Sequence, residues 1–387
     1  MRGFLKLFLG VAGAIGYIAA AGAAGVSDNE IVVGTHLDLS GPVAPGMPQL
    51  RNGTQMRFDE VNEAGGVNGR KIRLIVEDNG SQPQMAVRAV EKLTKSDHVF
   101  ALVNSFGSGT NAAAVKRVTA AGVIYFSPWG ASAILHKIAG DTPLLFTTIP
   151  NYDSAMALAL GWMIDQYKPK KIGFIHQEGP LGELVRAGVK KALDKRGMTV
   201  TAEAGYKAGD IDFSSQVARM KAADVDLIVT ATITRETVGV QTEIQKIGWN
   251  NVRVITASPG HTLIVLKLGK AALNGLYGAA SWKVFNPAEG TDWTKKWAAS
   301  YKKRFNLDAD ENALLAYAYA DWFVRGLQAA GRDLTTDSMV KALQASTDDN
   351  VIFFALEHFD HGHISPEAVR VDQAKDGRWL PVSPLLQ

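Results

Sequence analysis

Two short stretches of this chain combine hydroxyl groups, glycines and the expected start of a helix. The apolar strand at residues 100–103 runs into the loop Asn104–Thr110, and the apolar strand at residues 123–126 runs into the loop Ser127–Ser132. Hydroxyls and free backbone N–H groups at a helix start form a cradle for an anion. Neither loop contains histidine, cysteine or lysine. We therefore expect these loops to bind an anionic group rather than to catalyse a reaction.

The first loop also fits a dinucleotide-binding pattern, because Gly107–Ala112 reads G-x-G-x-x-A after a strand. That pattern requires an acidic residue at the end of the next strand, where it holds a ribose hydroxyl. The next strand ends in Phe126 and Ser127 instead. Since a helix start needs small residues in any case, we expect no nucleotide and no other cofactor.

A cluster of residue types that bind metals occurs near the C-terminus, at His358, Asp360, His361 and His363. An Asp-His-Gly turn at the tip of a hairpin accounts for this run without an ion, so we expect no metal. The chain has no cysteine, and it contains neither a G-x-S-x-G nor an H-E-x-x-H motif. We therefore expect a binding protein and not an enzyme. A dehydrogenase or hydrolase with the same strand–helix alternation is the alternative.

The first 23 residues have the pattern of an export signal. Arg2 and Lys6 give a positive start, and an apolar core at Leu7–Ile18 precedes the small-residue cleavage region Ala19–Ala24. Because this core is shorter than the roughly 20 apolar residues that span a membrane, we expect cleavage near Ala23 rather than an anchor. A chain without cysteine cannot be lipidated at an N-terminal cysteine. We expect a free, soluble protein in the periplasm.

Charge and length exclude some partners and indicate the number of domains. The whole chain has 41 basic and 38 acidic residues, without a basic block or an acidic tail. Neither nucleic acid nor a membrane surface is therefore an expected partner. The mature chain of roughly 360 residues is longer than one hydrophobic core usually holds, which favours two domains.

Strands and helices alternate from residue 27 to residue 256, which predicts parallel sheets with helices on both faces. Besides the two strands above, strands are expected at residues 31–34, 71–78, 171–176, 199–204, 226–230 and 253–256, and helices at 47–62, 82–95, 154–166, 181–196, 213–222 and 236–247. The last hundred residues predict helices at 292–305, 311–330 and 336–344, followed by short strands within 355–382.

A domain that begins with strand–helix units and ends with helices far along the chain has been interrupted by the other domain. We therefore expect an α/β protein of two doubly wound lobes with parallel central sheets. One lobe is expected at residues 27–149 plus 282–356 and the other at 150–281 plus 357–387. Several connections between the lobes would then form a multi-strand hinge.

Several motifs together resemble one family. They are the Ser-Gly-Pro sequence at 40–42, the segment Asn62–Gly69 before a strand that ends at Asp78, the two hydroxyl loops, and the late segment Asp376–Trp379. This combination resembles the leucine/isoleucine/valine-binding family of periplasmic substrate-binding proteins from ABC importers. The resemblance implies a type I periplasmic-binding fold, here a monomer, that closes on a small ligand and presents it to a membrane permease.

The resemblance also implies which residues bind the ligand. Ser105 matches the serine that binds the ligand carboxylate, and Trp129 to Ser132 match the loop that completes the cradle. The implied ligand-binding residues are Ser105, Phe106, Trp129, Gly130, Ala131, Ser132, Tyr152, Leu181, Ile233 and Ser258. Trp129 either stacks on the ligand or belongs to the core, and Phe106 either contacts the ligand or packs under its helix. Tyr152 either caps the ligand or fills the cleft.

Four positions depart from the pattern of family members that bind α-amino acids. Ser258 stands where an acidic residue binds the ligand ammonium group, Leu181 and Ile233 replace tyrosines, and Trp129 replaces a small residue. Burying an ammonium group without its partner costs roughly 3–5 kcal/mol, and every 1.4 kcal/mol is about tenfold in affinity. We therefore expect a small carboxylate with an apolar or aromatic body as the ligand.

Other ligands and roles stay open on the sequence. A branched-chain or aromatic amino acid would bind if Asp153, Glu178 or Glu236 replaced the missing acid. Arg235 stands at a helix start near the expected cleft, where it would either pair with the ligand carboxylate or be an ordinary exposed arginine. A periplasmic sensor would use the same closure to regulate a partner instead of feeding a permease.

Overall fold

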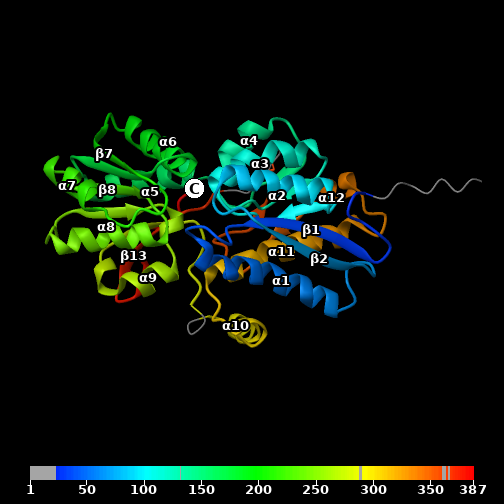
Figure 1. The fold of residues 1–387 in the computed structure, drawn as a ribbon. Helices are drawn as coiled ribbons and strands as arrows, with labels where there is room; N and C mark the ends of the chain where they lie inside the picture. The colour runs from blue at the N-terminus through cyan, green and yellow to red at the C-terminus, as the bar shows by residue number, and fades with distance from the viewer. Residues whose placement is uncertain (1–22, 131, 287–289, 360–362, 365–366) are drawn as a thin grey trace, which may run out of the picture.

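The computed structural model describes residues 23–130, 132–286, 290–359, 363–364 and 367–387. These residues form two α/β lobes that lie next to each other, each with a central sheet covered by helices on both faces (Figure 1). Of the expected export signal only Ala23 is among them, and the expected turn at Asp360–Gly362 lies outside them. Within the described ranges no helix is long and apolar enough to cross a membrane.

The first lobe is built on a five-stranded sheet of order β2-β1-β3-β4-β5, in which all neighbouring strands are parallel. Its strands are β1 (Glu30–Leu37), β2 (Lys71–Asp78), β3 (Ala101–Val103), β4 (Ile124–Phe126) and β5 (Leu145–Phe146). Its helices are α1 (Met47–Glu63), α2 (Pro83–Lys95), α3 (Ser108–Ala120), α4 (Ser132–Ala139), α10 (Asp292–Phe305), α11 (Glu311–Ala330) and α12 (Thr336–Gln344).

The second lobe is built on a seven-stranded sheet of order β14-β13-β10-β9-β8-β6-β7. Its strands are β6 (Ile172–Gln177), β7 (Val200–Tyr206), β8 (Leu227–Ala231), β9 (Arg253–Thr256), β10 (Tyr277–Ala280), β13 (Arg370–Lys375) and β14 (Arg378–Pro381). Its helices are α5 (Tyr152–Tyr167), α6 (Pro180–Asp194), α7 (Ser214–Ala222), α8 (Thr234–Lys246) and α9 (Leu263–Gly269). A separate two-stranded sheet pairs β11 (Thr347–Asp348) with β12 (Glu357–His358).

The expected fold class is confirmed, with one refinement in the second sheet. Strands β6 to β10 are parallel, but β13 runs antiparallel to β10, and β14 runs antiparallel to β13. The two-residue turn Asp376–Gly377, where φ is 51° and 75°, reverses the chain between β13 and β14. Positive φ at both positions is typical of the tight turn that joins antiparallel strands.

The chain passes between the lobes more than once (Figure 1). It leaves the first sheet after β5, returns to the first lobe after β10, and reaches the second sheet again at β13. Helix α11 therefore packs along α1 although the two helices are far apart in sequence. This layout allows two rigid lobes to move about the connecting segments.

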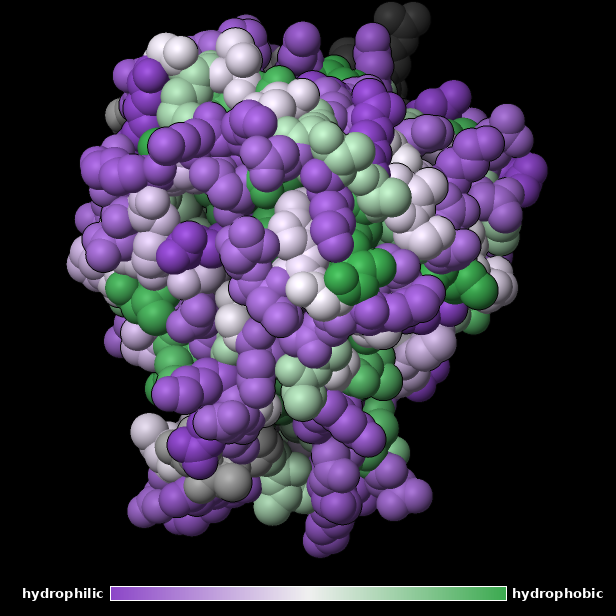
Figure 2. Space-filling view, turned by 90° about the vertical axis from the view of Figure 1, so that its left-hand side faces the viewer, coloured by the Kyte–Doolittle hydropathy of each residue, from purple (hydrophilic) through white to green (hydrophobic). Residues whose placement is uncertain are grey.

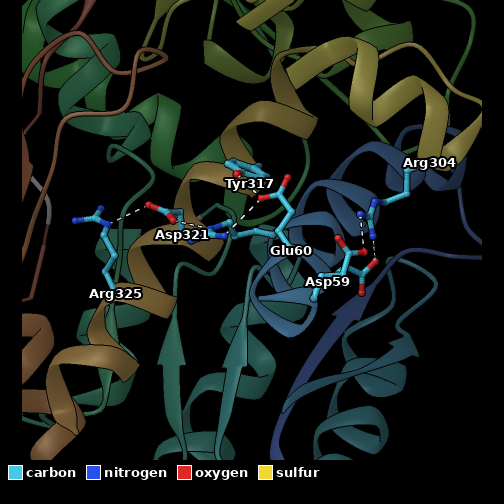
Figure 3. A network of polar contacts seen from close by, with 8 residues as sticks. Asp59, Glu60, Arg304, Tyr317, Asp321 and Arg325 are labelled. Carbon is cyan, nitrogen blue, oxygen red and sulfur yellow. Dashed lines mark hydrogen bonds and ion pairs between the residues drawn. The ribbon is translucent and has the colours of Figure 1, made fainter. Parts of the chain in front are cut away.

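Charged side chains bind the late helices α10 and α11 to α1 (Figure 3). Arg304 of α10 reaches Asp59 at 3.0 Å and Glu63 at 2.8 Å, while Asp321 of α11 lies 2.6 Å from Arg57 of α1. These side chains are partly exposed, so each ion pair contributes at most about 1 kcal/mol. Their effect is to fix how α10 and α11 lie on α1.

Candidate functional site

The loops that follow the carboxyl ends of the two sheets meet between the lobes. Arg235, at the start of α8, donates from Nη2 to the carbonyl oxygen of Pro42, in the loop after β1, over 2.8 Å. The N–H of Leu263, beyond β9, donates to Oε1 of Glu311 on α11 over 2.7 Å. Helices α3 and α6 are also in contact. The boundary between the lobes is thus the place where open α/β sheets bind ligands.

The two hydroxyl loops of the first lobe lie side by side. The N–H of Trp129 donates to the carbonyl of Ser105 over 2.7 Å, and the N–H of Gly107 donates to the carbonyl of Trp129 over 3.1 Å. Phe106 and Trp129 pair as an isolated parallel bridge. The two sheet strands β3 and β4 thus continue their pairing into the loops and hold both helix starts at one edge of the sheet.

A buried polar network behind these loops holds them in place. Nδ1 of His36 lies 3.0 Å from Nδ2 of Asn79, and Nε2 of His36 lies 3.0 Å from the hydroxyl of Tyr125. The Tyr125 hydroxyl donates to Oδ1 of Asn111 over 2.7 Å. Nδ2 of Asn111 then donates to the carbonyls of Ser105 at 3.2 Å and Trp129 at 3.0 Å.

The protons of this network can be assigned from its contacts. Because the Tyr125 hydroxyl gives its proton to Asn111, it accepts from Nε2–H of His36, and Nδ1 of His36 accepts from Asn79. Burial lowers the pKa of the His36 imidazole to about 3, so the ring is neutral. Sequence reasoning missed His36, Asn79 and Asn111. The available signal in the sequence was the presence of polar residues, His36 and Asn111, in otherwise apolar segments, because such residues need buried hydrogen-bond partners.

The first-lobe residues implied by the resemblance lie in or beside the two loops. Ser105 is fully buried, and its Oγ accepts from the N–H of His36 at 3.4 Å. Trp129 is 8% exposed, and its Nε1 donates to Oδ1 of Asn104 at 3.3 Å, so its indole belongs to the core of the lobe. Phe106 is partly buried against the same core.

The end of the second loop approaches the other lobe. Gly130 has φ +97°, and a Cβ built on it would lie 3.3 Å from the hydroxyl oxygen of Tyr152. Ala131 lies outside the described residues, and Ser132 is the first residue of α4. Tyr152, the first residue of α5, is buried, which raises the pKa of its phenol above the ordinary value and keeps it neutral.

The other three second-lobe residues each follow a strand of the second sheet. Leu181 lies buried on α6, after β6, and Ile233 precedes α8, after β8. Ser258 lies in a short 3₁₀ turn after β9, is 2% exposed, and its Oγ has no hydrogen-bond partner in the part of the chain that the structure describes. All three therefore lie at the edge of the second sheet where its parallel strands end.

The turn that carries Ser258 is attached to the second sheet by a buried hydrogen bond. Nε2 of His261 lies 3.1 Å from Oδ2 of Asp372 on β13, and both side chains are 1% exposed. The contacts with His261 and Arg370 hold the pKa of Asp372 below its usual value, although burial opposes this. A Cβ on Gly278 would lie 2.5 Å from the His261 ring, so β10 needs glycine there. Sequence reasoning missed this pair, because its members are 111 positions apart.

The three acids considered as replacements for the missing one all belong to the second lobe. The side chain of Glu178 lies over Gly205 of β7, with Cγ 3.5 Å from a Cβ built there. The carboxylate of Glu236 bonds the backbone of Gly209, just beyond β7. Strand β7 is at the edge of the sheet and is separated from β9 by two strands, so Glu178 does not stand beside Ser258. Helix α8, which carries Glu236, does contact the turn that carries Ser258. Asp153, next to Tyr152 on α5, has a buried Oδ1 without a partner among the described residues.

A groove of about 450 Å³ opens away from the lobe boundary, between the end of α8 and the amino-terminal ends of β9 and β10. Carboxamide side chains line much of it, together with Trp249, Arg253 and Tyr277. Figure 2, which views the second lobe from its outer end, shows a mostly hydrophilic surface with apolar residues in small patches. Because the groove lies at the opposite ends of the strands from Ser258, it is separate from the candidate site.

Relatives of known name share this sequence pattern. The chain is 31% identical over 199 residues to "Leu/Ile/Val-binding protein homolog 1" of Brucella abortus. These aligned residues make up 51% of this chain and 53% of that protein. The chain thus spans about half the length of that curated relative. It is 25% identical over 333 residues to "Leu/Ile/Val-binding protein BraC3" of Rhizobium johnstonii. That alignment covers 81% of this chain and 83% of that protein.

Solved structures share the fold at lower identity. A fatty acid ABC transporter substrate-binding protein from Thermomonospora curvata matches 94% of both chains with a TM-score of 0.81 and 24% identity. An ABC transporter solute-binding protein from R. palustris, solved with benzoate, matches 92% of this chain and 96% of that one with a TM-score of 0.79 and 17% identity. The family model described as "Periplasmic binding protein" matches residues 30–378. With this match over most of its length, the chain belongs to the periplasmic binding protein family.

Proposed function

We propose that this chain is the solute-binding subunit of an ABC uptake transporter of the branched-chain amino acid type. It captures a small carboxylate with an apolar or aromatic body between its lobes and delivers it to an inner-membrane permease. The observation that carries this proposal is the pair of adjoining loops after β3 and β4, held side by side at one edge of the first sheet. The serine at position 258, in the turn after β9 of the second lobe, supports the ligand class. The relatives named as Leu/Ile/Val-binding proteins support the binding role, and the structural neighbours titled as ABC transporter proteins support the transport role.

The mechanism follows from contacts that differ between open and closed lobes. The ligand carboxylate docks on the first lobe, at Ser105 and the loop Trp129–Ser132, while water fills the space between the lobes. Closure then adds Tyr152, Leu181, Ile233 and Ser258 from the second lobe. Because the ligand gains contacts only in the closed state, it shifts the population toward that state. The permease recognises the closed form through surfaces of both lobes.

The proposal also covers the residue ranges of the two lobes, the location of the protein and its oligomeric state. The moving units are residues 27–149 plus 282–356 and residues 150–281 plus 357–387. The protein acts in the periplasm after removal of residues 1–23, as a monomer, and binds without catalysing a reaction. The positive start and apolar core of the first residues support export.

The ligand class depends on the electrostatics beside Ser258. A carboxylate without an amino group needs no acid there, and the apolar side chains of Leu181 and Ile233 suit a hydrophobic body. The benzoate and fatty acid in the titles of two structural neighbours are ligands of this kind, although those neighbours share the fold alone.

An amino acid is the second candidate, and one observation favours it. Two carboxylates near the lobe boundary, Asp153 and Glu311, each keep a buried oxygen without a partner in the described ranges. Either oxygen would accept a hydrogen bond from a ligand ammonium group. Such a contact would offset the cost of burying that group, roughly 3–5 kcal/mol when it is unpaired.

A thermal-shift screen of the mature chain separates these ligands. One panel contains benzoate, cinnamate and hexanoate, and the other contains L-leucine, L-valine and L-phenylalanine. A ligand at about 100 times its Kd stabilises the folded chain by about 2.7 kcal/mol, which raises Tm by several degrees. We expect the shift from the first panel. A shift from the second panel alone would leave the fold and the transport role intact but contradict the ligand class.

A further inference from the structure

Glu311 forms a direct hydrogen bond across the lobe boundary. It is the first residue of α11 in the first lobe, and its Oε1 accepts from the N–H of Leu263, the first residue of α9 in the second lobe, over 2.7 Å. Its side chain is fully buried. Its second oxygen, Oε2, is buried and has no partner in the part of the chain that the structure describes. Separating the lobes would break this bond and expose the carboxyl group to water.

The partner of Glu311 belongs to the turn that carries a candidate ligand residue. Leu263 lies five positions after Ser258, and between them His261 is bound to Asp372 of the second sheet. Thr262 caps α9 by accepting from the N–H of Val265. The turn therefore moves as one body with the second lobe. A contact between Glu311 and Leu263 reports directly on whether that body has reached the first lobe.

The charges around Glu311 make its burial unfavourable for the ionised form. Its neighbour Asp310, which caps the start of α11, is the nearest acid, and Lys267 on α9 is the cation that faces it from the second lobe. Tyr301 of α10 faces Asp310. Burial, and then the charge of Asp310, raise the pKa of Glu311 to about 8. The hydrogen bond from the N–H of Leu263 and the positive charge of Lys267 oppose this rise. Asp310 is shifted upward as well, so the two acids titrate as a pair.

We propose that Glu311 is a closure residue: it bonds the second lobe only when the lobes meet, and it takes up a proton as it becomes buried, so that acidification favours lobe closure. The capture of a ligand by closure rests on the proposed function above, whereas the proton uptake concerns the chain alone. Glu311 acts as a positioning residue, because it fixes where the Ser258 turn stops against the first lobe. No group of the ligand is needed for this step.

The direction of the pH effect follows from the two environments of the carboxyl group. In the open state it is exposed to water and titrates near its ordinary value of 4.5, whereas in the closed state its pKa is about 8. The closed state therefore binds the extra proton between these two values. The ratio of closed to open chains should rise up to about tenfold for each pH unit of acidification in this window, and the effect should vanish above it.

The distance between the lobes can be measured in the ligand-free full chain. The natural sequence has no cysteine, so R88C on α2 and K191C on α6 introduce two labelling sites, both exposed, one on each lobe. Pulsed electron spin resonance on the doubly labelled protein gives the fraction of closed chains. We expect this fraction to rise as the pH falls from 8.5 to 5. A closed fraction that does not change with pH would overturn the proposal.

Two variants separate the bond from the proton. E311Q keeps the shape and the acceptor oxygen but carries no charge, so it should close equally at every pH of the series. L263P removes the N–H donor at the first helical position, where proline is tolerated, and Thr262 already has the extended backbone (φ −138°, ψ 159°) that a following proline requires. We expect L263P to close less than the parent at each pH but to retain the pH dependence.

The outcomes are distinct from those of the ligand screen, because no ligand is present. A pH dependence in E311Q as steep as in the parent would show that another group takes up the proton and would overturn the assignment to Glu311. Far-ultraviolet circular dichroism of each variant at each pH checks that it is folded. If the ligand screen failed while these results held, the proposed function would be wrong and the role of Glu311 in closure would stand.

Discussion

The variant G53A should lose about 3 kcal/mol or more of folding stability. Alanine in the interior of a helix is ordinarily better than glycine by about 1 kcal/mol. Here the backbones of α1 and α11 touch, and a Cβ on Gly53 would lie 2.1 Å from the carbonyl oxygen of Ala313. No rotation of a side chain relieves a clash with backbone, so the two helices must move apart and loosen the packing around them. Urea unfolding measures the change in the free energy of unfolding.

G109A is the matched control for this prediction. Gly109 lies in the first turn of α3 and a Cβ there would meet no atom within 4 Å. This variant should be unchanged or more stable by about 0.5–1 kcal/mol, because alanine has less conformational freedom to lose on folding. Equal stabilities of G53A and G109A would contradict the close approach of α1 and α11 in the first lobe.

The variant G130V should lower the affinity for the ligand at least about 100-fold. A valine is an outlier at φ +97°, and its Cβ would lie 2.6 Å from Oγ of Ser108 and 3.3 Å from the hydroxyl oxygen of Tyr152. Ser108 can rotate within its own lobe, but Tyr152 begins α5 of the second lobe, so a larger residue at position 130 presses against that lobe. The added methyl groups therefore oppose closure, and a loss of about 2.7 kcal/mol corresponds to the 100-fold effect.

G140V separates backbone strain from the obstruction of closure. Gly140 also has a positive φ, +69°, but a Cβ there would meet nothing within 4 Å. Both variants should lose stability through the strained backbone, and only G130V should lose ligand affinity. Calorimetric titration with the ligand found in the thermal-shift screen measures the affinity. A similar loss in both variants would show that Tyr152 does not approach Gly130 in the ligand-bound state.

The strands with strong apolar character were predictable from sequence, and the weaker ones were not. Strands β1 and β2 have buried apolar residues in clear patterns, whereas β5 is only two residues long and β10 reads Tyr-Gly-Ala-Ala. Glycine and alanine have little intrinsic preference for strands. Strand β10 exists because it pairs with both β9 and β13, and its partners on β13 lie 90 or more positions later in the sequence. Local patterns do not contain that information.

The same limit applies to the candidate site. The loops at Ser105 and Trp129 were predictable because each one follows a strand directly, and consecutive parallel strands place their loops at one edge. The residues that hold those loops in place were not predictable, because His36 and Asn79 act through contacts across three strands. The bond between Glu311 and Leu263 joins residues 48 positions apart in different lobes. No spacing rule predicts a contact that depends on how two lobes meet.

The central claim is that a small carboxylate binds between the lobes at Ser105. Calorimetric titration of the mature chain and of S105A with benzoate, cinnamate, hexanoate and L-phenylalanine tests it most directly. The account predicts that one of the three acids without an amino group binds with one site per chain. It also predicts a 10- to 100-fold weaker affinity in S105A, the effect of about 1.5–3 kcal/mol from one hydrogen bond to a charged group. Unchanged affinity in a folded S105A, or binding of L-phenylalanine alone, would contradict it.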